Sequence, residues 1–201
     1  GLFSLKGIVI KLAYAEGMSV SQVLTWRMAF ALPAYLVVGL IAFRRTRNRP
    51  TARLYIAAGG LGLLSYWFSS QLNFWGLQHV SAQLERLILY IYPTMVAILA
   101  FIFLKERITR NHLLALLLAY VGVAVLFASE INAQGRMALI GGIVIFIGAF
   151  PYAIYVTASR PFITKMGTAL FTSFAMSVAS IAFLVQSGVE MTLHPTPAPT
   201  L

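Results

Sequence analysis

The chain contains no cysteine and no aspartate. The absence of cysteine excludes a disulfide framework, a thiolate nucleophile and a cysteine-ligated metal site. Charged residues make up 10% of the 201 residues, whereas they make up about a quarter of a typical soluble domain. Hydrophobic residues make up 60%. A soluble fold of this size cannot bury so much apolar surface, so the composition predicts an integral membrane protein.

Seven apolar segments are candidates for membrane-spanning helices, which need about 20 mostly apolar residues each. Polar breaks between them are short, so neighbouring helices are expected to run antiparallel and pack as a bundle. The apolar runs do not alternate with polar residues, as the strands of a membrane barrel do. The predicted fold class is therefore all-α, a polytopic transmembrane helix bundle. Its predicted spans are residues 1–15, 19–43, 54–77, 82–104, 112–129, 137–158 and 168–187.

The first segment, GLFSLKGIVIKLAY, begins at Gly1 inside an apolar run. Two lysines interrupt it and no small-residue cleavage site follows, so it does not have the pattern of a signal peptide. We interpret it as a transmembrane helix that is truncated at its N-terminal end.

Basic residues are concentrated in alternate loops. Loops on one side of the predicted bundle contain Arg44, Arg45, Arg47, Arg49, Arg53, Lys105, Arg107, Arg110, Arg160 and Lys165. Loops on the other side contain only Arg136. The positive-inside rule places the basic loops in the cytoplasm, and residues 188–201 then form an extracytoplasmic, proline-rich linker. The net charge of +10 is explained by topology and does not indicate a nucleic-acid partner.

Charged side chains also occur inside the predicted spans, where each costs about 2.5–3.5 kcal/mol on insertion scales. Lys11, Arg27, Glu85 and Arg86 all fall in the outer third of the predicted bilayer. Three cations and one anion at one level favour a ligand that carries a carboxylate or phosphate. Two structural alternatives remain open: Glu85 and Arg86 could reach the outer surface, and Glu85 could neutralise Arg27. Glu85 is also the candidate proton carrier.

Polar residues recur at helical spacing on three of the spans, which predicts a cavity between them. Tyr66 and Asn73 share a face with Gly59, Gly62 and Ser70, although small residues at such spacing also serve helix packing. The predicted cavity residues are Lys11, Arg27, Tyr66, Asn73, Glu85, Arg86, Tyr90, Tyr152 and Tyr155.

Four segments resemble EamA-like members of the drug/metabolite transporter superfamily. FSLKGIVIKLAYAEGMS followed by WRMAFALP resembles the first two helices of that family. SAQLERLILYIYPTMVAILAFIFLKERIT followed by LLALLLAYVGVAVLF resembles the fourth and fifth helices. The resemblance implies ten helices built as two inverted five-helix repeats. Residues 1–130 are then the first repeat, and residues 137–187 are the first two helices of the second.

The resemblance further implies a transporter of the bacterial inner membrane that moves a small metabolite by alternating access and needs no cofactor. It matches Arg27, Glu85, Arg86, Tyr90 and Pro93 to recurrent family positions, with Pro93 in a structural role. Glu106 fits the glutamate that ends the fourth helix. Its expected role is structural as well, because it can pair with Arg110 one turn later.

Two other classes of function compete with a transporter of an anionic or zwitterionic metabolite. A membrane-embedded transferase would need a cluster of acids and histidines, but His79, His112 and His194 fall at span edges or in loops. We therefore predict no enzymatic activity, no catalytic residues and no metal site. A non-transporting scaffold is the other alternative. The expected partners are a small-molecule substrate and the lipid bilayer, while the identity of the substrate, the coupling ion and the oligomeric state stay open.

Overall fold

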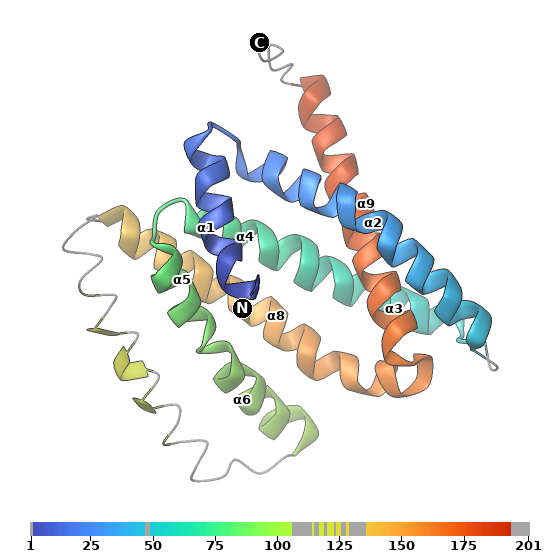
Figure 1. Ribbon diagram of the computed structural model, residues 1–201. Helices are drawn as coiled ribbons and strands as arrows, with labels where there is room; N and C mark the ends of the chain where they lie inside the picture. Colours follow the sequence, from blue (N-terminus) through green and yellow to red (C-terminus); the bar gives the residue numbers. More distant parts are fainter. Residues whose placement is uncertain are drawn as a thin grey trace.

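The computed structural model describes residues 2–46, 49–105 and 136–193, together with isolated positions between 114 and 128. The regular elements in this part of the chain are helices (Figure 1). Glu106 and most of the span predicted at 112–129 lie outside the described residues. The helices are α1 (Leu2–Ala15), α2 (Val20–Arg45), α3 (Ala52–Gly62), the π-helix η1 (Leu63–Ser69), α4 (Ser70–Leu77), α5 (Ala82–Leu89), α6 (Tyr92–Leu104), α8 (Arg136–Met166) and α9 (Thr168–Leu193).

Four of the described helical stretches are long and apolar enough to cross a membrane: Val20–Arg45, Ala82–Phe103, Arg136–Met166 and Thr168–Glu190. Helix α1 has 14 residues, which is short for a span. Residues 52–77 are helical throughout, as predicted, but they are not among these four stretches. The protein is thus a multi-pass helical membrane protein, and seven spans and an inverted repeat stay predictions.

Local sequence signals set several helix ends. Ser19 and Gln22 form a capping box at the start of α2: the Gln22 N–H donates to Ser19 Oγ (3.2 Å), and the Ser19 N–H donates to Gln22 Oε1 (2.9 Å). Gly17 follows α1 with φ +83°, and Gly167 separates α8 from α9 with φ +80°. Both glycines adopt the left-handed conformation, which side chains with a Cβ disfavour, and this allows the chain to reverse there.

The observed helix bounds correct three expectations. The span predicted as one helix at 82–104 is divided into α5 and α6 at Tyr90–Ile91, because Pro93 has no N–H to donate to the carbonyl of Leu89. Helix α8 continues through Pro161 to Met166, although the sequence predicts a break at 158–167. Helix α9 continues through residues 188–193, which were assigned to the linker.

Long helices pack along one another through small residues. Helix α2 packs against α9, while η1, α4 and α6 pack against α8 (Figure 1). A Cβ at Gly62 would overlap the backbone of Ala175 on α9. A Cβ at Gly76 would lie 2.7 Å from the carbonyl oxygen of Gly141 on α8. These glycines therefore allow close backbone approach, and the helices that they hold in place surround a cavity.

Candidate functional site

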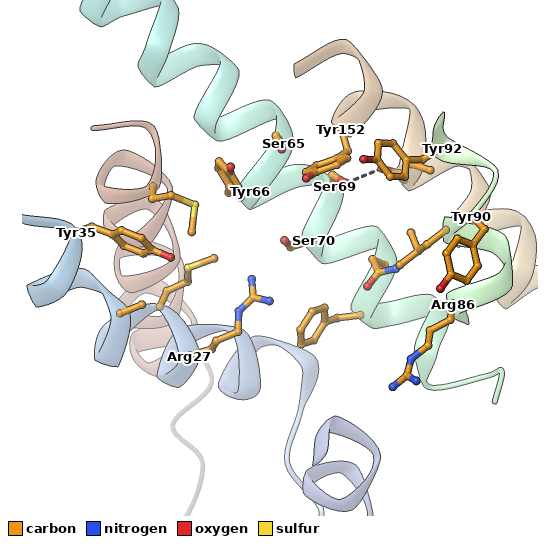
Figure 2. A pocket seen from close by; sticks show the side chains of 18 residues that line it. Arg27, Tyr35, Ser65, Tyr66, Ser69, Ser70, Arg86, Tyr90, Tyr92 and Tyr152 are labelled. Carbon is orange, nitrogen blue, oxygen red and sulfur yellow. Dashed lines mark hydrogen bonds between the residues drawn. The ribbon is translucent and has the colours of Figure 1, made fainter. Parts of the chain in front are cut away.

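A cavity of about 690 Å³ lies between α2, the η1–α4 segment, the α5–α6 junction, α8 and α9 (Figure 2). Ligand sites in proteins commonly measure about 300–1,000 Å³, so this volume suits a small organic molecule. Its wall is formed by Arg27, Met28, Ala31, Tyr35, Ser65, Tyr66, Ser69, Ser70, Asn73, Phe74, Arg86, Leu89, Tyr90, Tyr92, Gly148, Ala149, Tyr152 and Met176.

Two arginines provide the charge of this wall. Both line the cavity, and in Figure 2 the Arg27 side chain, from α2, points toward the central space, while the Arg86 side chain, from α5, extends away from it. The Arg27 Cζ atom lies 4.9 Å from the centroid of the Phe74 ring, a cation–π contact that holds the guanidinium in place. Arg86 Nη2 is buried without a hydrogen-bond partner. Among the described residues of the wall there is no carboxylate, so the wall carries a net positive charge.

Tyrosines gather on another part of the cavity wall. Tyr66 donates a hydrogen bond from its hydroxyl to that of Tyr155 (3.0 Å), which connects η1 to α8. The rings of Tyr92 and Tyr152 meet edge to face, with centroids 5.3 Å apart. Tyr152 in turn lies 6.1 Å from Tyr155, ring centroid to ring centroid. This chain of aromatic contacts connects α6, α8 and η1 and makes that part of the wall apolar but capable of hydrogen bonding.

The π-helical turn at Leu63–Ser69 decides which residues face the cavity. It supplies Ser65, Tyr66 and Ser69 to the wall, and Ser69 Oγ donates to the Gly148 carbonyl (2.5 Å). A π turn has wider spacing than an α turn, so it changes the face that the residues before it present. Gly62 consequently packs on α9, although α-helical spacing predicts it on the same face as Tyr66. Single π turns inside helices occur frequently at functional sites.

Six of the nine residues predicted to surround a cavity line this one: Arg27, Tyr66, Asn73, Arg86, Tyr90 and Tyr152. The structure does not place Lys11, Glu85 or Tyr155 on its wall. Glu85 is buried in the first turn of α5, with 2% of its surface exposed. Tyr155 lies behind Tyr66, and Lys11 is half-buried on α1. The role of each residue toward a solute stays a prediction.

Other residues of the wall were not among the predicted ones. Tyr35 follows Arg27 by two helical steps of four residues, so the spacing on α2 could have identified it. Tyr92 follows the break between α5 and α6, where helical periodicity no longer applies. Ser65 and Ser69 depend on the π turn, for which no local sequence signal is recognised.

Comparison with known proteins agrees with the membrane architecture. The model of the EamA-like transporter family matches residues 2–128, and that of solute carrier family 35 matches residues 79–191. The uncharacterized transporters YyaM and YcbK of Bacillus subtilis are 29% and 27% identical to the chain, over 84% and 94% of its length. A transporter of Archaeoglobus fulgidus is 27% identical over 77% of the chain.

The chain spans 56%, 60% and 52% of the lengths of these three relatives. No solved structure matches it. The family model covers more than half of the chain, and the relatives align along most of it. This chain therefore belongs to the EamA-like transporter family.

Proposed function

We propose that this protein is a secondary transporter that moves a small anionic or zwitterionic metabolite across the bacterial inner membrane by alternating access. The observation that supports the proposal most is the cavity of about 690 Å³ that holds Arg27 and Arg86 with no carboxylate on its described wall. Membership of a transporter family supports it independently.

The two arginines explain why the solute is expected to carry negative charge. A cation within a membrane protein is costly unless an anion or a wet cavity compensates it. Arg27 contacts the Phe74 ring with its guanidinium group, and the N–H groups of an arginine can bind a carboxylate or phosphate in a bidentate manner. Arg86 brings a second cation to the cavity wall. A solute with negative charge would compensate the net positive charge of this wall.

Alternating access is supported by features of the helices around the cavity. The α5–α6 helix is interrupted at Tyr90–Ile91, and η1 interrupts the α-helical geometry between α3 and α4. The left-handed turns at Gly17 and Gly167 occupy corresponding places, after α1 and after α8. This correspondence fits two inverted repeats that rock against each other around a central site. The basic loops are proposed to face the cytoplasm, and the C-terminal end of α9, within the segment 188–201 that was predicted to be extracytoplasmic, the opposite side.

Glu85 is the candidate for proton coupling. If coupling runs through it, Glu85→Gln should make transport independent of pH, and retained pH dependence in that variant would remove Glu85 from the mechanism. The position of Glu85 also suits a structural role, because the N-terminal turn of a helix stabilises negative charge. In that case Glu85→Gln lowers the thermal stability and leaves the pH profile of transport intact.

Exchange transport in proteoliposomes tests the proposal. Proteoliposomes that contain the full-length protein are loaded with unlabelled organic acids. Uptake of labelled acids from a mixed pool is then measured for wild type, Arg27→Gln and Arg44→Gln. Arg44→Gln is the control, because it removes the same charge from the other end of α2, outside the cavity. We expect Arg27→Gln to lower exchange at least about tenfold, the effect of about 1.4 kcal/mol, and Arg44→Gln to retain it. Equal exchange by both variants would contradict the proposal.

A further inference from the structure

We infer that the cavity selects a net-anionic organic acid that carries an aromatic or other planar apolar ring, in preference to zwitterionic amino acids and to small hydrophilic anions. The inference rests on the proposed transport function and makes its substrate class narrower. Three observations carry it: the charge of the cavity wall, the rings that line it, and the internal use of two of its hydroxyl groups.

The charge of the wall disfavours a zwitterion. Arg27 and Arg86 already bring two positive charges to one cavity, and Arg86 Nη2 is buried without a hydrogen-bond partner. The ammonium group of an amino acid would add a third cation, and the described wall offers it no carboxylate. Like charges within a cavity of low dielectric repel strongly, so an acid without an ammonium group neutralises the site better.

Rings from separate helices line the cavity, both beside the arginines and away from them. Aromatic side chains come from α2, η1, α4, the α5–α6 junction, α6 and α8, and Figure 2 shows several of their labelled rings around the central space. These rings are Tyr35, Tyr66, Phe74, Tyr90, Tyr92 and Tyr152. Ring pairs in proteins contribute about 0.5–1.5 kcal/mol beyond their buried area, and adaptable Met28 and Met176 complete the apolar wall.

Two hydroxyl groups of the wall are used within the protein. Tyr66 donates its hydroxyl hydrogen to Tyr155, and Ser69 donates to the Gly148 carbonyl. Neither hydrogen is available to an occupant, so these two side chains do not compete with the arginines for an acid group. A small hydrophilic anion such as acetate would bind at the arginines and leave most of the 690 Å³ without contacts. A ring acid uses both the arginines and the rings.

Thermal-shift titrations of the full-length protein in detergent test the inference with matched probes at pH 7. Phenylacetate carries a ring and a carboxylate, acetate lacks the ring, and phenylalanine adds an ammonium group. We expect phenylacetate to raise the melting temperature with at least about tenfold higher affinity than either of the other two, as about 1.4 kcal/mol provides. Arg27→Gln and Tyr152→Leu should each reduce its affinity. Trp26→Leu removes an exposed ring outside the cavity and should not. If Arg27→Gln does not fold, Arg86→Gln replaces it.

The outcomes distinguish a failure of the predicted ring-acid preference from a failure of the proposed transport function. Equal affinity for phenylalanine and phenylacetate would overturn the preference for a net anion, and equal affinity for acetate would overturn the ring preference. In both cases an anion-binding or zwitterion-binding transporter survives. Binding of none of the three probes would overturn the inference together with the proposed substrate charge.

Discussion

Single side chains give the cavity wall its charge and its aromatic character. Arg27 is held against Phe74, and Tyr66 is held against Tyr155. Sequence reasoning could identify Arg27, Arg86 and Tyr90, because a charge or a polar ring within an apolar span costs free energy and needs a reason to be there. It could not tell that Tyr155 lies off the wall while Tyr152 lies on it. These two tyrosines are one helical turn apart and look equivalent in the sequence.

The Tyr66–Tyr155 hydrogen bond should be measurable as a coupling energy. Tyr66→Phe and Tyr155→Phe should each lower the free energy of unfolding by about 1 kcal/mol, because the remaining hydroxyl loses its partner. The double variant should cost no more than either single change. Tyr35→Phe, on the same cavity wall, is the control, with an expected effect within about 0.5 kcal/mol. Unfolding titrations in micelles measure all four variants, and additive losses would show that the bond contributes nothing.

The elements around the cavity were predictable in type and less so in their interruptions. Apolar run length predicts where helices lie, and Pro93 gives a physical reason for the break between α5 and α6. The π turn of η1 depends on how α3 and α4 fit against α8 and α9 simultaneously, which no local pattern encodes. Pro161, in contrast, does not end its helix. Helix α8 continues through it to Met166, and the chain turns at Gly167.

Because α3 packs closely on α9, alanine substitutions at two nearby glycines are expected to change the stability of the protein in opposite directions. A Cβ at Gly62 would overlap the Ala175 backbone, whereas a Cβ at Gly60 meets nothing within 4 Å. Gly62→Ala should therefore destabilise the protein by about 1–3 kcal/mol. Gly60→Ala should stabilise it by up to about 1 kcal/mol, because alanine favours the helix. Thermal unfolding of both variants in detergent checks this, and equal shifts would contradict the α3–α9 contact.

For the whole molecule, the sequence predicts the all-helical membrane class and the family, and both are confirmed. The number of spans and the inverted repeat stay predictions, since four described stretches qualify as spans. Orientation rests on the asymmetry of basic residues. Because the chain has no cysteine, single cysteines can test it directly.

The predicted orientation is tested by labelling intact cells with an impermeant maleimide. Thr51 and Gln78 flank the stretch at residues 52–77, and both are exposed. The positive-inside rule predicts that Gln78→Cys is labelled from outside and that Thr51→Cys is labelled only after the cells are permeabilised. The reverse pattern would invert the topology.

The most direct test of the central claim is ligand protection of a cysteine placed inside the cavity. Ser70 lines the cavity between the arginines and the tyrosines (Figure 2), and Gln78 lies outside it. A thiol reagent is applied to the full-length Ser70→Cys and Gln78→Cys variants with and without phenylacetate. We expect phenylacetate to slow the labelling of Ser70→Cys and to leave that of Gln78→Cys unchanged. Unchanged labelling of Ser70→Cys at saturating phenylacetate, with Arg27 intact, would contradict the claim that a ring acid occupies this cavity.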